Sequence, residues 1–208
     1  MRFADLDAVT LDGFGTLLTL IDPVPTLLES LREREIECSA ERITAGFEAE
    51  GEYYKPRSLE GHDAETLARL RLDCTRVFLE SAGVDLDPAE FVDTYIDALR
   101  FELVPGVAEA VASLQRRGLA LAVVGNWDMT LPGHLAEVGL GDLAVVTSAG
   151  AGAAKPDPRP FRLALEELGV RPERALHIGN EETDDLGAKA AGMHFAWAPV
   201  AAALETLE

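Results

Sequence analysis

The stretch Ala-Val-Thr-Leu-Asp-Gly-Phe-Gly-Thr, residues 8–16, joins a short, largely apolar run to an acidic residue and two glycines. The run Ala8–Leu11 lacks regular alternation, which favours a strand buried on both faces. Asp12 then stands where this strand ends, on a tight loop whose amide groups could bind phosphate oxygens. A carboxylate in this position suits a nucleophile. For this stretch alone, an ordinary turn is the alternative.

Four further apolar runs follow, and helical patterning separates them. They are Leu119–Val124, Leu143–Val146, Ala175–Ile178 and His194–Ala198. Between them, Pro105–Arg117 and Arg159–Leu168 each carry an apolar stripe at helical spacing, and a glycine follows each. This βαβ series predicts an α/β fold, a doubly wound and mainly parallel sheet with helices on both faces.

The long segment between Leu11 and Leu119 has a mostly helical pattern. Its candidate helices are Pro25–Glu35, Ala40–Tyr54, Ala64–Ser81 and Pro88–Phe101. The segment is too long for a simple crossover, so we interpret it as a small α-helical cap over a site. The predicted domains are an α/β core of residues 1–18 and 103–208 and a cap of residues 19–102.

The charge of the chain limits its partners. The 208 residues carry a formal net charge of −19, which argues against nucleic acid and anionic membranes because both require basic patches. A small phosphorylated substrate is compatible, since a few local cations can act against the global field. No apolar run approaches the length of a transmembrane helix, and the N-terminus MRFADLD has an Asp where a signal peptide needs apolar residues. We therefore expect a soluble, cytoplasmic protein.

Chemistry-bearing residues also follow the next predicted strands, at the edge where open α/β sheets bind ligands. Asn126 and Trp127 follow the second strand. Lys155 follows the third, and the proline after it favours an extended backbone, so the lysine could act as a fixed cation. The segment Gly179–Asp185 follows the fourth and carries four acidic side chains and an Asn. These could hold a hard divalent cation such as Mg²⁺, or they could simply favour the dipole of the next helix.

Four motifs in this order, with a helical insertion after the first, resemble the haloacid dehalogenase superfamily over nearly the whole chain. The most specific stretches are Gly-Asn-Trp-Asp at 125–128, Lys-Pro-Asp-Pro at 155–158 and Gly-Ala-Lys-Ala-Ala-Gly at 187–192. The resemblance implies a nucleophile at Asp12, with Lys155 between it and a phosphate. It also implies that Thr16 and Asn126 donate hydrogen bonds to the transferred group.

The same resemblance implies a magnesium site. Its ligands would be Asp12, the backbone carbonyl of Phe14 and Asn180, with Asp185 behind them. Asn180 departs from the phosphatases of the family, which have an Asp there, so we expect Mg²⁺ to bind weakly. Gly125 stands where a Ser or Thr usually binds phosphate.

Phe14 is the third departure, because the phosphatases of the family have a second Asp there as general acid and base. Losing a positioned general acid costs about 10²–10⁴-fold in rate, mainly with poor leaving groups. We therefore expect a slow, Mg²⁺-dependent phosphatase of a small phosphorylated metabolite, acting through an aspartyl-phosphate on Asp12.

Two alternatives stay open. A 2-haloacid dehalogenase needs no general acid, so Phe14 is compatible with it, but such enzymes usually have a Tyr where this chain has Phe161. A catalytically impaired binding protein that keeps the fold is the other. For substrate contacts, Tyr54 in the predicted cap and Trp127 are candidates. His177 is more typical of a buried structural residue than of a base.

Overall fold

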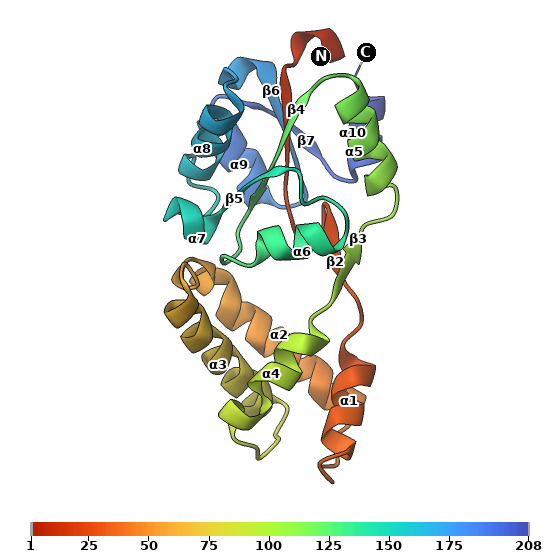
Figure 1. Cartoon of the computed structure of the whole chain (residues 1–208), viewed down its shortest axis with the longest axis vertical. Coiled ribbons are helices and arrows are strands. Elements are labelled where there is room, and N and C mark those ends of the chain that lie inside the picture. Colours follow the sequence, from red (N-terminus) through yellow and green to blue (C-terminus); the bar gives the residue numbers. More distant parts are fainter. Residues whose placement is uncertain (1, 208) are drawn as a thin grey trace. The chain divides into compact units, whose positions relative to one another are not determined.

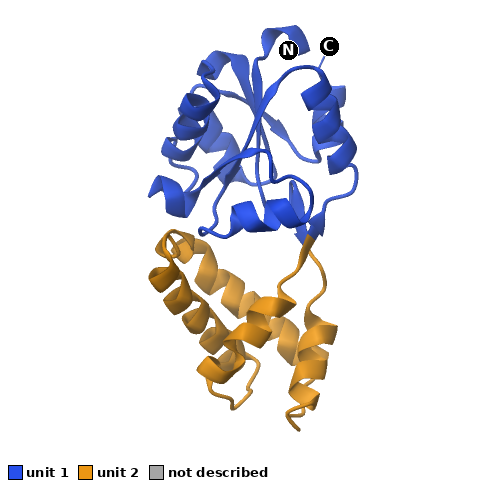
Figure 2. Ribbon diagram, in the orientation of Figure 1, with its two compact units in different colours: residues 1–19, 102–208 blue, residues 20–101 orange. Residues whose placement is uncertain are grey.

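The computed structural model describes residues 2–207 and shows two compact units (Figures 1 and 2). A core unit comprises residues 1–19 and 102–208, and a helical unit comprises residues 20–101. The chain therefore leaves the core unit shortly after its first strand and returns to it before the second strand of the large sheet. No helix within residues 2–207 is long and apolar enough to cross a membrane.

The core unit is built on a five-stranded sheet with the order β5-β4-β1-β6-β7. The strands are β1 (Ala8–Leu11), β4 (Ala120–Gly125), β5 (Ala144–Thr147), β6 (Ala175–Gly179) and β7 (His194–Trp197). Every neighbouring pair runs parallel. The predicted parallel α/β sheet is thus confirmed, and all residues of the three central strands except Ala120 are buried, as their apolar composition requires.

Helices cover both faces of this sheet (Figure 1). In chain order they are α5 (Val107–Arg116), α6 (Leu131–Glu137), α7 (Ser148–Ala151), α8 (Arg159–Leu168), α9 (Glu182–Ala190) and α10 (Val200–Glu205). Phe161 and Leu165 of α8 and Ala188 of α9 form one buried cluster with strand residues such as Ala8. The 3₁₀ segments Phe3–Asp5 and Pro172–Arg174 precede β1 and β6.

The helical unit consists of α1 (Val24–Arg32), α2 (Ala40–Tyr54), α3 (Ala64–Ser81) and α4 (Pro88–Ala98), with a 3₁₀ turn at Lys55–Glu60. Three of the helices begin with a side chain that accepts a backbone hydrogen bond in the first turn, namely Ser39, Asp63 and Asp87. An aromatic cluster fills the interior, with Phe78 lying 4.7 Å from Tyr95 between ring centroids. The predicted spans of α2, α3 and α8 match the observed ones.

Two predicted helices of this unit are too long, and the first, Pro25–Glu35, ends at Arg32. Pro88–Phe101 ends at Ala98 because Phe101–Leu103 forms a strand, β3, that pairs with β2 (Leu18–Leu20). The backbone amide of Ile21 donates to the carbonyl of Arg100 at 2.8 Å, which extends this pairing. This small sheet has no signal in the sequence pattern, because its two strands are short and lie far apart along the chain.

Candidate active site

The carboxyl ends of β1, β4 and β6 meet at one edge of the sheet. Leu11 lies opposite Val123 of β4 and Ile178 of β6, so the residues that follow these three strands are neighbours. Asp12 comes directly after Leu11, and its amide donates to the carbonyl of Ile178 at 2.9 Å. The nucleophile position predicted from the sequence thus lies on the central strand, at the edge where ligands bind in such sheets.

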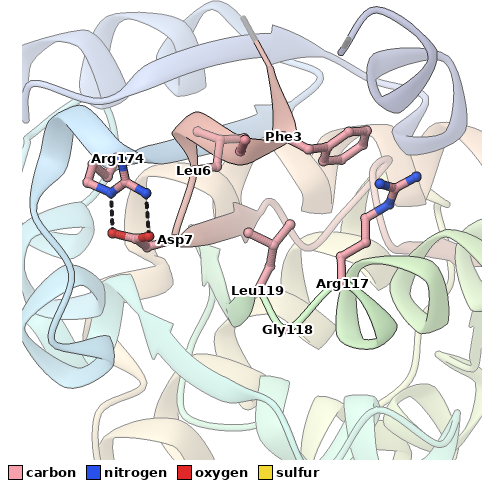
Figure 3. Close-up of a pocket in the computed structure, with 8 residues that line it drawn as sticks. Phe3, Leu6, Asp7, Arg117, Gly118, Leu119 and Arg174 are labelled. Atoms are coloured by element: carbon pink, nitrogen blue, oxygen red, sulfur yellow. Dashed lines mark hydrogen bonds and ion pairs between the residues drawn. The ribbon is translucent and has the colours of Figure 1, made fainter.

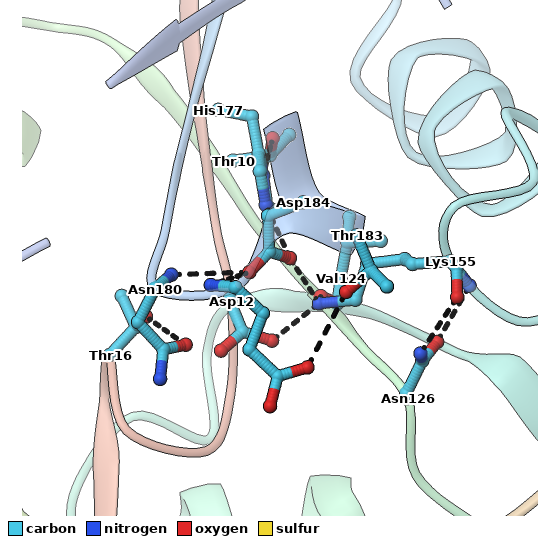
Figure 4. Close-up of polar contacts among 11 residues, drawn as sticks. Thr10, Asp12, Thr16, Val124, Asn126, Lys155, His177, Asn180, Thr183 and Asp184 are labelled. Atoms are coloured by element: carbon cyan, nitrogen blue, oxygen red, sulfur yellow. Dashed lines mark hydrogen bonds and ion pairs between the residues drawn. The ribbon is translucent and has the colours of Figure 1, made fainter. Parts of the chain in front are cut away.

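Lys155 is the centre of a buried ionic cluster (Figure 4). Its ammonium nitrogen lies 2.5 Å from Oδ1 of Asp12, 2.5 Å from Oδ1 of Asp184 and 3.0 Å from the carbonyl of Val124. All three charged side chains are buried. Three acceptors match the three protons of an ammonium group, so Lys155 is fully satisfied as a cation.

Asp184 enters this cluster through the geometry of α9. It occupies the third position of the helix, and its Oδ2 accepts from the backbone amides of Glu181 at 3.0 Å and Asn180 at 3.1 Å. This capping arrangement turns the carboxylate back toward the end of β6. A Cβ at Gly179 would lie 2.4 Å from Cγ of Asp184, so the glycine leaves the space that the carboxylate fills.

His177 continues the cluster into the core. Its Nε2 lies 3.2 Å from Oδ1 of Asp184, and its Nδ1 lies 2.8 Å from Oγ1 of Thr10. The ring is completely buried, which confirms the interpretation of His177 as a structural residue. Burial lowers its pKa, so the imidazole is neutral at neutral pH.

Burial and charge act in opposite directions in the cluster. Burial alone would lower the pKa of Lys155, but Asp12 and Asp184 raise it above its usual range. For Asp184, burial would raise the pKa, yet the bonds from His177 and Lys155 bring it below its usual range. Burial raises the pKa of Asp12 above its usual range, Lys155 offsets this only in part, and the negative charge of Asp184 acts in the same direction as burial.

The loop after Asp12 is a tight turn. The amides of Leu17 and Leu18 both donate to the carbonyl of Gly13, at 3.0 and 2.9 Å. Gly15 has a φ of +81°, and a Cβ there would lie 2.3 Å from Nδ2 of Asn180. Two constraints therefore require glycine at position 15: the left-handed backbone conformation and the close approach of the Asn180 side chain.

The side chain of Asn180 lies against this loop. With Oδ1 facing the loop, it accepts from Oγ1 of Thr16 at 3.2 Å. With the amide turned over, Nδ2 lies within donor distance of three acceptors, Oδ2 of Asp12 at 3.0 Å, the carbonyl of Phe14 at 3.1 Å and Oγ1 of Thr16 at 3.2 Å, and its two protons serve two of them at a time. The structure thus brings together Asp12, Phe14 and Asn180, the three groups that the sequence analysis assigned to a magnesium site.

Comparison with known proteins identifies the family of the chain. The family model for haloacid dehalogenase-like hydrolases matches residues 6–192. The chain is a haloacid dehalogenase-like hydrolase. A phosphoserine phosphatase from Thermus thermophilus is 33% identical over 90% of this chain and 86% of its own length.

Other members of the family match with different extents. Haloacid dehalogenase-like hydrolase domain-containing protein 3 from Mus musculus is 35% identical, but the match covers only 50% of this chain and 43% of the mouse protein. Among solved structures, an L-2-haloacid dehalogenase from Xanthobacter autotrophicus is 26% identical, with a TM-score of 0.68, over 93% of this chain and 77% of that chain. The relatives of this chain thus include proteins named as phosphatases and proteins named as dehalogenases.

Two predicted substrate contacts of this haloacid dehalogenase-like hydrolase have other partners in the structure. Asn126 donates through Nδ2 to the carbonyl of Lys155 at 3.1 Å and accepts from the Lys155 amide at 2.7 Å. It therefore holds the lysine backbone in place. Thr16 is completely buried beside Asn180. Tyr54 ends α2 and belongs to the helical unit, so its role as a substrate contact stays a prediction.

Phe14 and Trp127 form an apolar border of the site. Phe14 is 52% exposed, and its ring centroid lies 6.3 Å from that of Trp127 in an edge-on arrangement. A Cβ at Gly125 would lie 2.9 Å from Cδ2 of the buried Leu131. Leu131 thus occupies the space into which a Ser or Thr at position 125 would project.

The sequence predicts Asp185 behind the magnesium ligands, but in the structure the acid that contacts the backbone of Asn180 is Asp184. Asp185 points along α9 to Lys189, whose Nζ lies 2.7 Å from its Oδ1. Successive helix positions are turned by about 100°, so only one of the two acids faces the end of β6. The signal that could have found Asp184 is its place three residues after Glu181, the residue before the helix.

A cavity of about 510 Å³ lies at the opposite edge of the sheet (Figure 3). Its lining includes Leu6, Leu119 and Arg174, residues that precede β1, β4 and β6. Arg174 forms an ion pair with Asp7, with one contact of 2.6 Å. The cavity is therefore separate from the candidate active site, which lies where the same strands end.

The oxygens around Asp12 form a partial donor set for a divalent cation. Within residues 2–207, no three His, Cys, Asp or Glu side chains form a metal-binding group. Asp12, the Phe14 carbonyl and the Asn180 side chain nevertheless supply oxygens, the ligands that Mg²⁺ prefers, when Oδ1 of Asn180 faces the loop. The set fits Mg²⁺ in this orientation, with a single formal charge among the ligands.

Proposed function

We propose that the protein is a slow, Mg²⁺-dependent phosphatase of small phosphorylated metabolites that forms an aspartyl-phosphate on Asp12. The single observation that supports this best is the ion pair between Asp12 and Lys155 at the end of the central strand, with a distance of 2.5 Å. A buried carboxylate with a fixed cation beside it is suited to attack a negatively charged phosphorus centre, because the cation offsets the repulsion between them.

In the proposed reaction, a carboxylate oxygen of Asp12 attacks phosphorus and the bond from phosphorus to the leaving oxygen breaks. Water then attacks the phosphorus of the aspartyl-phosphate, which releases phosphate and restores the carboxylate. Lys155 balances charge throughout, and Asn126 and Asp184 hold it by its backbone and by its ammonium group. Asn126 retains one Nδ2 proton for the transferred group, as its predicted role requires.

Mg²⁺ would be held by Asp12, the Phe14 carbonyl and Asn180, and it would supply positive charge next to the transferred phosphoryl group. The other predicted member of this site is Asp185. In this proposal Asp184 takes that role instead, because its Oδ2 accepts from the backbone amide of Asn180. With one charged ligand, the site is expected to bind Mg²⁺ weakly.

The leaving group has no protonated side chain beside it in this proposal. Phe14 takes the position of the general acid and is half exposed, so an alkoxide must take its proton from water. Turnover is therefore expected to be much faster with nitrophenolate than with alkoxide leaving groups.

Hydrolysis of p-nitrophenyl phosphate with and without Mg²⁺ tests the proposal, with Asp12→Asn as the matched variant of similar shape. Activity that requires both Mg²⁺ and Asp12 supports it. Equal release by the wild type and the variant would rule it out and favour the catalytically impaired binding protein. The role of the helical unit as a cap and the cytoplasmic location stay predictions.

A 2-haloacid dehalogenase is the second candidate, because a specific observation favours it. In one orientation the amide of Asn180 satisfies Oδ2 of Asp12 without any cation, so this carboxylate is held in place for attack on carbon. Against it, Phe161 is buried in the core cluster and offers no hydroxyl. Halide release from 2-chloropropionate, measured in EDTA with wild type and Asp12→Asn, distinguishes the two activities.

A further inference from the structure

The side-chain amide of Asn180 can turn either its oxygen or its nitrogen toward the loop, and in the metal-free site the contacts favour the nitrogen, because two of the groups that it faces are acceptors. In the first orientation, Oδ1 faces the loop and lies 3.0 Å from Oδ2 of Asp12 and 3.1 Å from the carbonyl of Phe14, both of which are acceptors. In the second, Nδ2 takes the same place and donates to both. The oxygen and nitrogen of an amide have nearly the same shape, so either atom fits.

The first orientation is unfavourable unless a metal ion is present. It brings Oδ1 of Asn180 against Oδ2 of Asp12 and the carbonyl oxygen of Phe14, with no proton between them. The spacing itself suits a small divalent ion. Mg²⁺ binds oxygens at about 2.0–2.1 Å in octahedral geometry, which puts adjacent ligand oxygens about 2.8–3.0 Å apart. The observed distances of 3.0 and 3.1 Å from Asn180 to Asp12 and Phe14 are close to this value.

The second orientation needs no metal ion. Nδ2 then donates one proton to Oδ2 of Asp12, while the ammonium group of Lys155 donates one to Oδ1. The carboxylate of Asp12 is thus bonded on both oxygens by groups of this chain alone.

The surroundings of Asn180 accommodate both orientations. Thr16 is completely buried, and its hydroxyl lies 3.2 Å from whichever amide atom faces the loop. A hydroxyl donates to Oδ1 or accepts from Nδ2 equally well. Gly15 leaves open the space beside the other amide atom, where any Cβ would lie 2.3 Å away.

We propose that Asn180 is an amide switch: its Nδ2 protons take the place of the metal when none is bound, and the amide turns over to present Oδ1 when Mg²⁺ binds. The inference rests on the magnesium site of the proposed function, but it requires no turnover. An aspartate at this position could not make the same exchange, because it would bring a second carboxylate against Asp12 whenever the metal is absent.

Side-chain amide signals in ¹⁵N–¹H correlation spectra test the switch directly. The chain contains two asparagines, Asn126 and Asn180, and one glutamine, Gln115, so three NH₂ pairs are expected. Asn126→Asp and Asn180→Asp assign them by removing one pair each. The switch predicts that Mg²⁺ shifts the Asn180 pair in a saturable way, with the Gln115 pair unchanged. An Asn180 pair that stays the same at every Mg²⁺ concentration would overturn it.

Thermal unfolding and calorimetric titration with Mg²⁺ supply a second readout. In EDTA, Asn180→Asp should melt below the wild type, and with Mg²⁺ it should gain more in Tm and bind the ion at least about tenfold tighter. Asn126→Asp adds the same charge at the neighbouring strand end and should show no such gain. Equal Tm values of wild type and Asn180→Asp in EDTA would contradict the switch, as would equal Mg²⁺ affinities.

If Asn180→Asp folds only when Mg²⁺ is added, that result supports the switch. If it does not fold in either condition, the spectra of the wild type decide. Neither measurement contains substrate, so a failed phosphatase assay together with a responsive Asn180 amide sinks the proposed function and leaves the switch standing. Hydrolysis that requires Mg²⁺ while the Asn180 amide signals stay unchanged would support the proposed function and overturn the switch.

Discussion

Oδ1 of Asp184 lies 2.5 Å from the ammonium nitrogen of Lys155, the same distance that separates this nitrogen from Oδ1 of Asp12. One buried cation therefore serves two carboxylates, the nucleophile and an acid on the next helix. Since removing one member of a buried ionic group leaves the others without compensation, Asp184 should matter for both stability and catalysis.

Asp184→Asn is expected to lower the free energy of unfolding by about 3 kcal/mol, because it removes a buried partner of Lys155. It should also lower the rate of p-nitrophenyl phosphate hydrolysis, because Lys155 then shifts toward Asp12. Urea unfolding and steady-state kinetics measure the two effects.

Asp185→Asn is the matched control for Asp184→Asn. Asp185 pairs with Lys189, which is largely exposed, one turn along the same helix. The Asp185 side chain is 19% exposed but its partner is reached by solvent, so the loss of stability should be well below that at Asp184, and the rate should hardly change. A larger effect at Asp185 than at Asp184 would show that the two acids are assigned the wrong way round.

Gly15→Ala should disturb the site more than its backbone strain explains. A residue other than glycine in the left-handed region costs roughly 1–2 kcal/mol, and at Gly15 the new Cβ also displaces Asn180. Gly139→Ala is the control, since Gly139 has a φ of +83° but no atom within 4 Å of the added Cβ. We expect urea unfolding to show the larger loss at Gly15, and Mg²⁺-dependent hydrolysis to fall only there. Equal losses in the free energy of unfolding at the two positions would mean that displacing Asn180 costs no stability.

Phe14→Asp should restore a general acid to the phosphatase. Phe14 is 52% exposed, so the fold should tolerate the change. The rate with an alkyl phosphate is expected to rise by up to about 10²–10⁴-fold, while that with p-nitrophenyl phosphate changes little, because only the poor leaving group needs a proton. Phe14→Asn, which has the same size and no acidic proton, should leave the ratio of the two rates unchanged. The prediction is wrong if Phe14→Asp leaves the ratio of the alkyl to the aryl rate unchanged. It is also wrong if Phe14→Asn changes this ratio as well.

Ionisation of the Glu50 carboxyl is expected to make the stability of the helical unit depend on pH. Burial raises the pKa of this carboxyl above its usual range, and the neighbouring Cys74 and Tyr95 side chains offset this only in part. A raised pKa in the folded state means that the stability contribution is present below the unfolded pKa of about 4.3 and is lost as the pH rises through the folded pKa.

Glu50→Gln should remove this loss, because a neutral amide has no proton to release. Unfolding midpoints measured from pH 4 to pH 8, relative to the wild type, should therefore rise for the variant as the pH increases. Glu48→Gln, at an exposed position of the same helix, is the control and should follow the wild type. A wild type and Glu50→Gln that change in parallel with pH would contradict the prediction.

Much of the fold was predictable because it depends on local patterns. The buried runs around Val9, Val123 and Ile178 are apolar without alternation, and this alone indicates a parallel sheet covered on both faces. Helices such as Ala64–Ser81 and Arg159–Leu168 carry both an apolar stripe and recognisable ends, so their spans could be predicted. The small sheet of β2 and β3 could not, because it depends on pairing between distant segments.

The sequence by itself determined which strand ends carry Asp12, Lys155 and Asn180, because strand order and loop composition place those residues at one edge of the sheet. Only the tertiary structure decided how their side chains are paired. Asp184 rather than Asp185 meets Lys155, because the start of α9 sets which acid turns toward β6. The amide of Asn180 likewise meets Asp12 across a gap that Gly15 leaves open, and such contacts between distant segments depend on the packed backbone, which no local pattern specifies.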